Sequence, residues 1–287
     1  MSPEPVQAVT VVGAGVMGRG IALAAARAGY ATRVVEPDAA AIQSARAEVD
    51  RILARSAEKG ELSAEDAGTA RARIAWSTGA EGARGSDLVI EAAPESLALK
   101  AEVYRTLAPH LPAHAVLATN TSSLSITELA ATSDRPDRFV GMHFFNPVHR
   151  MRLIELVRGR LTSDGTLDRA ERVSRAMGKE TVVVRESPGF VTTRINALIG
   201  NEAFAMLEAG VASARDIDKA VRLGLNHPMG PFEMIDLVGL DTRLHILEYL
   251  HRTLGEKFRP NPLHVQYVKE GRLGRKAGRG VHEYPGS

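Results

Sequence analysis

Apolar and polar positions near the start of the chain follow the pattern of a strand, a turn, a helix and a second strand. Residues 8–12 form a short, β-branched apolar run, which is typical of a strand buried on both faces of a parallel sheet. A glycine-rich turn over residues 13–18 comes next, and the small residues of 21–28 predict a helix ended by Gly29. Residues 31–35 predict the next strand.

Further apolar runs predict more strands, and longer periodic stretches between several of them predict helices. The expected strands cover residues 87–90, 115–118, 139–142, 153–157 and 181–184, and two expected helices cover residues 97–107 and 167–177. Residues 38–72 break the alternation, because they have the pattern of two helices joined near Lys59 and Gly60 with no strand between them. Strands that alternate with helices predict an α/β fold of the Rossmann type, with a mostly parallel sheet and this helical hairpin inserted.

The pattern changes near Ser187, Pro188 and Gly189. From Phe190 onward it is helical, interrupted by prolines, and no strong strand signal remains. A chain of 287 residues is long enough for two domains of roughly 150 residues each. We therefore expect an α/β domain over residues 1–186 and an all-α domain over residues 187–287.

Composition excludes several classes of protein. The chain has no cysteine, which excludes disulfides, thiolate metal sites and a cysteine nucleophile. Its N-terminus lacks the basic and apolar regions of a secretory signal, and no apolar stretch reaches the ~18 residues of a membrane span. We therefore expect a cytoplasmic protein with no membrane contact. A metal site is not expected either, since Pro112 separates the two closely spaced histidines, His110 and His114.

The balance of charge gives no sign of a nucleic-acid partner. The formal net charge is +2 and only 5% of the residues are aromatic, whereas nucleic-acid binding calls for a basic stripe with interleaved aromatics or a known module. Two local basic clusters are interpreted as solvated surface, with contact to a phosphate-bearing ligand as the alternative for the second. They consist of Arg150, Arg152, Arg158 and Arg160, and of Arg272, Arg275, Lys276 and Arg279.

The glycine-rich turn has the full context of a dinucleotide site. Gly13, Gly15 and Gly18 follow a predicted strand and open a predicted helix, and Glu36 ends the next strand 18 residues later. The first glycine allows the tight turn, the second lets a pyrophosphate approach the backbone, and the third lets helix and strand pack closely. Glu36 can accept a hydrogen bond from a ribose 2′-hydroxyl and would repel a 2′-phosphate. The pattern predicts NAD rather than NADP.

A second group of polar residues follows two later strands. Asn120, Ser122 and His143 lie at or near the ends of strands, where open parallel sheets bind ligands. The ordinary pKa of histidine suits proton transfer near neutral pH. Glu155, in an apolar strand twelve residues after His143, is a candidate carboxylate partner for its ring, with a buried ion pair to an arginine as the alternative.

These motifs, taken in order, resemble those of the 3-hydroxyacyl-CoA dehydrogenases. They are GAGVMG at 13–18, EAAPE at 91–95, NTSS at 120–123, HFFNP at 143–147, PGF at 188–190, HPMGPFE at 227–233 and GRKxGxG at 274–280. The resemblance covers nearly the whole chain. The chain length is similar to that of the short, stand-alone members that act on 3-hydroxybutyryl-CoA.

The resemblance implies a role for each matching residue. His143 would be the general base, paired with Glu155, while Ser122 and Asn146 would hold the substrate oxygen and the nicotinamide. The implied cofactor-binding residues are Gly13, Gly15, Val16, Met17, Gly18, Glu36, Ala93, Glu95, Lys100 and Asn120. The hairpin resembles the family's CoA-binding element, with Ser56 and Lys59 as candidates, although Lys59 also fits an ordinary surface residue. The helical domain would form a homodimer.

Two departures from the family pattern concern the substrate domain. Thr193 stands where the family usually has an asparagine that contacts substrate, and Asn196, on the same face of a predicted helix, is a candidate replacement. Val281 and His282 stand where two aromatic residues are usual. Short acyl chains are expected. Two alternatives stay open, namely a dehydrogenase of a CoA-free 3-hydroxy acid such as gulonate or carnitine, and a non-catalytic NAD-binding relative of the crystallin kind.

Overall fold

The computed structural model describes residues 5–284 of the chain. The chain divides into two compact units, the first ending at Ser187 and the second beginning at Pro188. Each unit has its own core, so each is described by itself.

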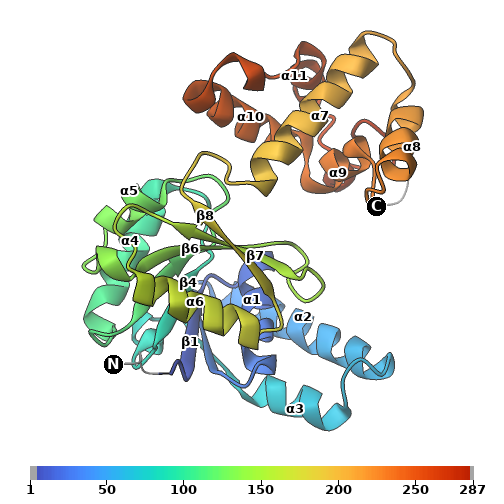
Figure 1. Ribbon diagram of the computed structural model, residues 1–287. Coiled ribbons are helices and arrows are strands. Elements are labelled where there is room, and N and C mark those ends of the chain that lie inside the picture. Colours follow the sequence, from blue (N-terminus) through green and yellow to red (C-terminus); the bar gives the residue numbers. More distant parts are fainter. Residues whose placement is uncertain (1–4, 285–287) are drawn as a thin grey trace. The chain divides into compact units, whose positions relative to one another are not determined.

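An eight-stranded sheet forms the centre of the first unit (Figure 1). Its strands are β1 (Ala8–Val12), β2 (Ala31–Val35), β3 (Ile74–Ser77), β4 (Leu88–Glu91), β5 (Val116–Thr119), β6 (Phe139–Phe144), β7 (Leu153–Arg158) and β8 (Glu180–Arg185). Their spatial order is β3-β2-β1-β4-β5-β6-β7-β8. All neighbouring pairs are parallel except β6 and β7, which are antiparallel. The order from β3 to β6 is that of a Rossmann sheet, so the predicted fold class is confirmed.

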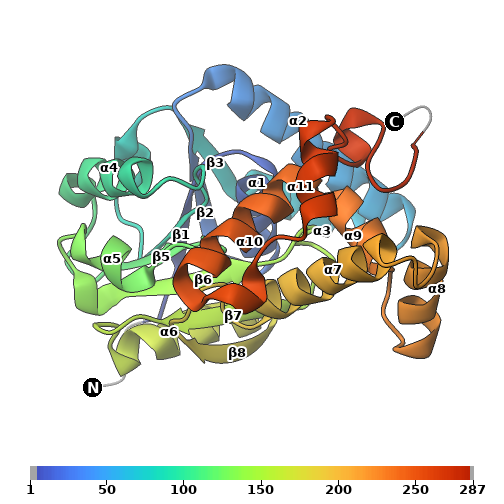
Figure 2. The same cartoon turned by 90° about the horizontal axis from the view of Figure 1, so that it is seen from above.

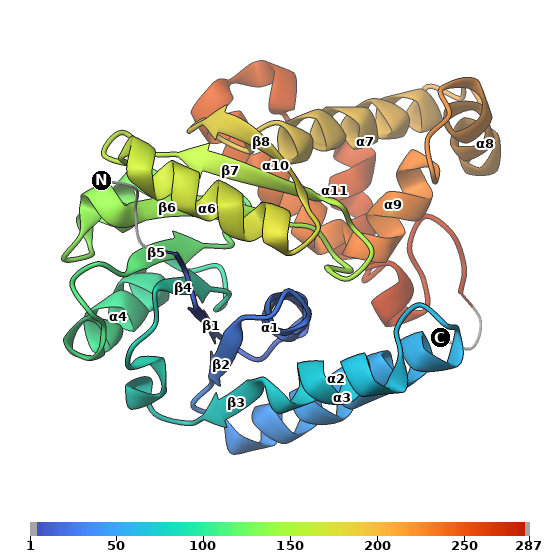
Figure 3. The ribbon, with the colours of Figure 1, turned by 60° about the horizontal axis from the view of Figure 1, so that its bottom comes forward.

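The helices of the first unit connect these strands. They are α1 (Val16–Arg27), α2 (Ala39–Glu58), α3 (Ala64–Ala72), α4 (Leu97–Leu107), α5 (Ile126–Ala131) and α6 (Asp164–Ala176), with short 3₁₀ turns at Ala80–Ala83, Ala108–His110 and Pro136–Arg138. The predicted helical hairpin is confirmed, since α2 and α3 lie side by side (Figure 3). Asp38 and Ser63 cap their N-termini with side-chain hydrogen bonds.

Two local features were not anticipated. Strand β3 was missed, because it is a four-residue edge strand with a single buried residue, Ile74, and lacks a regular alternation of apolar and polar positions. Helix α6 begins at Asp164, three residues before the predicted start, because Ser163 acts as its N-cap and accepts a hydrogen bond from Thr166.

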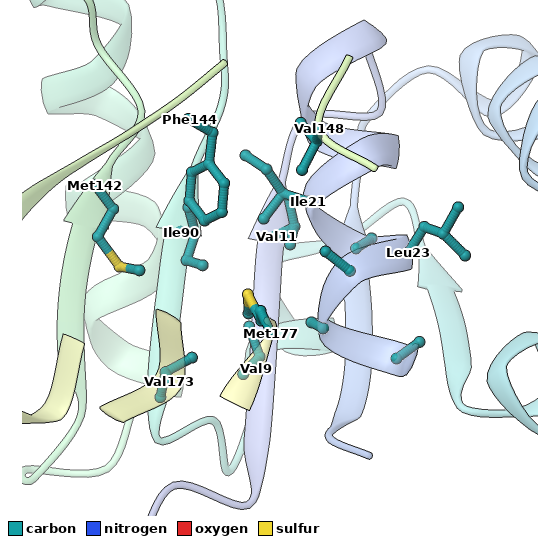
Figure 4. Close-up of a cluster of buried hydrophobic side chains, with 14 of the residues drawn as sticks. Val9, Val11, Ile21, Leu23, Ile90, Met142, Phe144, Val148, Val173 and Met177 are labelled. Carbon is teal, nitrogen blue, oxygen red and sulfur yellow. The ribbon is translucent and has the colours of Figure 1, made fainter. Parts of the chain in front are cut away.

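Side chains alternate between the two faces of the sheet, and one face packs on α1, α2, α3 and α6. Figure 4 shows part of this core, with Val9 and Val11 of β1 near Ile21 of α1 and Met177 just after α6. The opposite face packs on α4, where Tyr104 meets the ring of Phe139 edge to face at 5.0 Å. His143 and Glu155 alternate with core residues along β6 and β7, so their side chains are directed toward this second face.

The second unit is helical. It contains α7 (Thr192–Glu208), α8 (Ala214–Gly224), α9 (Pro231–Val238), α10 (Leu240–Leu254) and α11 (Pro262–Lys269), with short 3₁₀ turns at Glu256–Phe258 and Arg275–Ala277. Helix α10 packs against α7, α9 and α11 (Figure 2). Phe204, Phe232 and Leu240 are fully buried in the core of this second unit. Among residues 5–284, no helix is long and apolar enough to cross a bilayer.

Candidate active site

The turn between β1 and α1 requires its glycines. Gly13 has a φ of +100°, which favours glycine, and a Cβ there would lie 2.8 Å from the carbonyl oxygen of Ala92. A Cβ on Gly18 would lie 1.9 Å from the carbonyl oxygen of Gly13. Gly15 faces open space, with nothing within 4 Å of a Cβ built there. The turn is therefore closed against the sheet and open toward solvent, as a phosphate cradle must be.

A cleft of about 770 Å³ begins at this turn and fits a dinucleotide. The turn lines it with Gly13, Gly15, Val16 and Met17. Glu36 at the end of β2, Ala93 in the loop after β4, and several residues of α4 complete the lining. Helix α1 begins without a side-chain cap, so its first amides and the positive end of its dipole are available to an anion. The residues present thus fit the pyrophosphate of NAD.

Glu36 lies at the end of β2, where its carboxylate fixes the turn. Its Oε2 accepts a hydrogen bond from the amide of Ala14 at 3.0 Å, and its Oε1 accepts one from Asp38 at 3.1 Å. Each oxygen keeps further acceptor capacity, because a carboxylate offers about four lone-pair sites. The negative charge therefore remains on the wall of the cleft.

A buried network of charged and polar side chains supports the loop after β4. Glu91 is fully buried, and its Oε1 accepts from the ammonium of Lys100 at 2.6 Å. Its Oε2 accepts from the hydroxyls of Tyr104 and Thr119 at 2.9 and 2.7 Å. Lys100 also donates to the carbonyl oxygen of Ala93 at 3.1 Å. Burial, and then the charge of Glu91, raise the pKa of the Tyr104 hydroxyl well above its usual value.

The geometry around Lys100 bears on its expected contact with the cofactor. Its ammonium lies 3.5 Å from Glu95 in addition to its two hydrogen bonds, and its side chain is 1% exposed. Lys100 therefore supports the wall of the cleft through Ala93 and Glu95, and a direct contact with NAD stays a prediction.

Glu95 joins this loop to the one after β5. Its carboxylate accepts hydrogen bonds from the hydroxyl of Thr121 at 2.5 Å and from the amides of Ser122 and Ser123 at 3.1 and 3.3 Å. Because all these donors converge on one oxygen, Glu95 orders the segment that carries Ser122.

His143, Glu155 and Ser122 come together at the centre of the site. His143 and Glu155 are opposite each other in the antiparallel pair β6·β7, and the ring Nδ1 lies 2.7 Å from Glu155 Oε2. Glu155 is fully buried and His143 is 6% exposed. The hydroxyl of Ser122 lies 3.2 Å from the other ring nitrogen, Nε2. The carboxylate favours the tautomer with the proton on Nδ1, which leaves Nε2 as a base beside a hydroxyl.

The two asparagines near this centre differ in their surroundings. The side-chain oxygen of Asn120 accepts a hydrogen bond from the amide of Phe144 at 2.9 Å, which ties the loop after β5 to the end of β6. Its amide nitrogen stays available as a donor. Asn146 is exposed and precedes Pro147 through a cis peptide bond.

The remaining candidates belong to the helical hairpin and to the second unit. Ser56 is buried near the end of α2 and donates to Glu61 at 3.2 Å, while Lys59 is exposed just beyond the helix. Thr193 and Asn196 are half-buried on α7, in the second unit, so their approach to the substrate stays a prediction. Within residues 5–284 no three His, Asp or Glu side chains are grouped as metal ligands would be.

Comparisons with known proteins identify the family of the chain. Residues 8–187 match the family model described as "3-hydroxyacyl-CoA dehydrogenase, NAD binding domain", and residues 189–284 match the model of that family's C-terminal domain. The chain belongs to the 3-hydroxyacyl-CoA dehydrogenase family. The resemblance inferred from the motifs is thus confirmed, and NAD is the cofactor that the family's first domain binds.

Individual members of the family match nearly end to end. The chain is 44% identical to a probable 3-hydroxybutyryl-CoA dehydrogenase of Bacillus subtilis, over 97% of this chain and 98% of the relative. It is 41% identical to a 3-hydroxybutyryl-CoA dehydrogenase of Bradyrhizobium diazoefficiens, over 98% and 97%. The crystal structure of (S)-3-hydroxybutyryl-CoA dehydrogenase from Ralstonia eutropha superposes with a TM-score of 0.94 at 44% identity, over 97% of this chain and 99% of that one.

Two polar groups in the structure were not found from the sequence. Glu91 was recognised only as part of a motif, although an acidic residue that ends an apolar strand signals a buried, paired charge. The second is His282, whose Nε2 lies 2.7 Å from the buried carboxylate of Asp218. No local pattern links residues so far apart in sequence.

Proposed function

We propose that the protein oxidises (S)-3-hydroxyacyl-CoA of short chain length, such as 3-hydroxybutyryl-CoA, to the 3-ketoacyl-CoA. The observation that carries the proposal is the buried His143, held between Glu155 at 2.7 Å and Ser122 at 3.2 Å. The names of the relatives support the substrate class. A non-catalytic role would require neither of these two contacts.

His143 acts as the general base in this proposal. Its Nε2 takes the proton of the 3-hydroxyl, a contribution of typically ~10²–10⁴ in rate. NAD, when bound, supplies the acceptor for the hydride that leaves C3. Glu155 stabilises the imidazolium that forms, because its carboxylate already accepts the Nδ1 proton at 2.7 Å. The hydroxyl of Ser122 donates a hydrogen bond to the substrate oxygen, and Glu95 keeps Ser122 in position by accepting a hydrogen bond from its backbone amide.

Asn146 and Asn120 are the proposed polar contacts of the nicotinamide side. The side-chain oxygen of Asn120 accepts a hydrogen bond from the backbone amide of Phe144, which fixes the direction of its NH₂ group and supports this role. In the second unit, Thr193 and Asn196 are the proposed substrate contacts on α7. Their spacing of three residues brings them to one face of that helix.

A cavity beside the hairpin supports binding of the CoA moiety. It has a volume of about 230 Å³ and includes Ser56 and Lys59 in its lining. Arg51, Arg55 and Arg150 line it as well, against two glutamates. Guanidinium and ammonium groups suit the phosphates of CoA.

A homodimer formed through the second unit is part of the proposal. Ile195 on α7 is 54% exposed, and Val211, Leu223 and Leu225 are each more than 60% exposed. Exposed apolar side chains in such number favour burial against a partner.

The direct test is NADH formation, followed by absorbance, on adding (S)-3-hydroxybutyryl-CoA. A panel of four-, eight- and sixteen-carbon acyl-CoA substrates is compared with free gulonate and carnitine. We expect the highest kcat/KM with the four-carbon acyl-CoA and no turnover of the free acids. Turnover of a free acid with no turnover of any CoA ester would overturn the substrate class.

A further inference from the structure

A second cavity of the first unit has a basic lining that the proposed mechanism does not use. Its volume is about 310 Å³, and it lies among α1, the end of α6 and the segment after β6. Its charged or titratable lining residues are Arg27, His149, Arg150, Arg152 and Lys179. Leu23 and Met177, labelled in Figure 4, supply part of its apolar lining. No acidic residue is among the described residues that line it.

The fold itself selects these residues. Arg150, Arg152, Arg158 and Arg160 look like one basic cluster along the sequence, but β7 separates them into two pairs. Arg158, at the far end of β7, forms an ion pair with Asp164 at 2.6 Å. Arg150 and Arg152, before β7 begins, meet Arg27 and Lys179 from other parts of the chain instead.

These positive charges are only partly compensated, by Glu48 and Glu61 of the adjoining hairpin cavity. In the part of the chain that the structure describes, the side chains of Arg27, His149 and Arg150 take part in no ion pair or hydrogen bond. Arg152 faces Glu180 at 3.3 Å, but both side chains are more than 70% exposed, so solvent screens this pair. Burial, followed by the charges of Arg150, Arg27 and Lys179, lowers the pKa of His149, as expected for crowded like charges.

Lys179 adds a buried donor to the cavity. The residue is only 9% exposed, and its ammonium donates to the carbonyl oxygens of Val148 and Met151 at 2.5 and 2.8 Å. An ammonium has three donors, and the third has no partner within residues 5–284. Burial, together with the charge of Arg27, lowers the pKa of Lys179. A buried ammonium with a spare donor beside unpaired guanidiniums is suited to an anion.

We propose that this cavity binds a phosphate-type dianion through Arg27, Arg150, Arg152 and Lys179. Guanidinium forks match the oxygens of a phosphate, and a dianion would offset the repulsion among the four cations. The phosphate has two possible sources. One is free phosphate, and the other is a phosphate group of CoA reaching from the hairpin cavity, which shares Arg27, His149 and Arg150 with this one. Only the second source rests on the proposed function.

Inorganic phosphate is the probe for the site itself. Its binding to the full-length protein is measured by titration calorimetry at low ionic strength, with saturating NAD present so that the dinucleotide cleft is filled. We expect binding at this cavity, separate from binding in the hairpin cavity. Arg152→Ala, which alters this cavity but not the hairpin cavity, should weaken the binding about two- to fivefold, because Arg152 is an exposed charge.

Two control variants separate this site from other basic surface. Arg175→Ala, on the nearby α6 but paired with Glu171 at 2.7 Å, should leave binding unchanged. Arg55→Ala, which lies in the hairpin cavity alone, should also leave it unchanged. If inorganic phosphate fails to bind the wild type, or if Arg55→Ala weakens the binding while Arg152→Ala does not, the proposal is overturned.

A kinetic comparison then distinguishes the two sources. If the site holds the 3′-phosphate of CoA, which is its dianionic group, Arg152→Ala should raise KM for 3-hydroxybutyryl-CoA about two- to fivefold but leave KM for its 3′-dephospho form unchanged. A rise in KM for both forms would overturn the assignment to a dianion. If the site holds free phosphate, KM for both substrates should stay as in the wild type while the binding of inorganic phosphate is still weakened. Absence of turnover with every acyl-CoA would refute the proposed function, whereas the calorimetric result would still decide this proposal.

Discussion

Replacing Lys100 with methionine should destabilise the first unit strongly, because it leaves a carboxylate buried without its counter-ion. Lys100 is 1% exposed and Glu91 fully buried, and their charged atoms are 2.6 Å apart. Removing one partner of such a pair typically costs about 3 to 5 kcal/mol. Domains are commonly stable by only ~5–15 kcal/mol, so the loss is a large part of the whole. The remaining donors to Glu91 are neutral hydroxyls and an amide, which cannot replace the charge.

The single tryptophan of the chain makes the measurement specific. Trp76 lies in β3, so its fluorescence reports unfolding of the first unit in a urea titration. Arg105→Met is the matched control, since Arg105 lies on the same helix but its pair with Glu102 is exposed on both sides. A pair of that kind contributes about 0 to 1 kcal/mol.

A double variant tests the physical reason. Glu91→Gln combined with Lys100→Met removes both charges, so it should be more stable than Lys100→Met alone. A loss below about 1 kcal/mol in the single variant would refute the reasoning. So would a double variant that is no more stable than the single one. If the variant instead keeps its stability and loses only NAD affinity, Lys100 is a cofactor contact and not a support for the loop.

Four further predictions concern catalysis, cofactor choice, pH and assembly. His143→Gln should lower kcat by ~10²–10⁴ with NADH binding retained, while His114→Gln, a histidine also paired with a carboxylate, should keep wild-type kcat; equal activity of the two variants would contradict the assignment. Glu36 should make kcat/KM for NAD well above that for NADP, and Glu36→Ala should narrow the difference. The hydrogen bond to Asp218 raises the pKa of His282 above 6.5, so the stabilisation by protonated His282 is full below pH 6.5 and is lost as the pH rises through the raised pKa. The unfolding temperatures of the wild type and His282→Gln, measured by calorimetry, should therefore differ at low pH and converge at high pH. Sedimentation at micromolar concentration should give twice the 30.8 kDa chain mass, and a monomer would exclude the proposed dimer.

Much of the fold could be predicted because its signals are local. The apolar run of β1, the glycines of the turn and the small residues of α1 follow one another directly, so the first β-α-β unit is visible in the sequence. The same holds for the hairpin, whose two helices are contiguous. Strand β3 lacked such a signal, because an edge strand with one buried residue depends on its neighbour β2 for its hydrogen bonds.

The same distinction between local and tertiary signals applies to the candidate site. Sequence alone identified the chemical groups, because a glycine turn, an acid that ends a strand and a histidine near the end of a strand each have a local pattern. The tertiary structure decided which groups meet. His143 reaches Glu155 through the antiparallel register of β6 and β7, and a shift of one residue would turn Glu155 to the other face of the sheet.

Burial and pairing of charge were decided by the tertiary structure alone. The sequence gives no indication that Glu91 needs Lys100, or that Arg27 and Lys179 share a cavity with Arg150. The physical reason is that a charge costs little in water and much in the interior, so its role depends on which side chains surround it after folding. The chain therefore determines by itself where its strands, turns and reactive groups occur. Packing determines which of those charges are paired, which are buried and which remain available to a ligand.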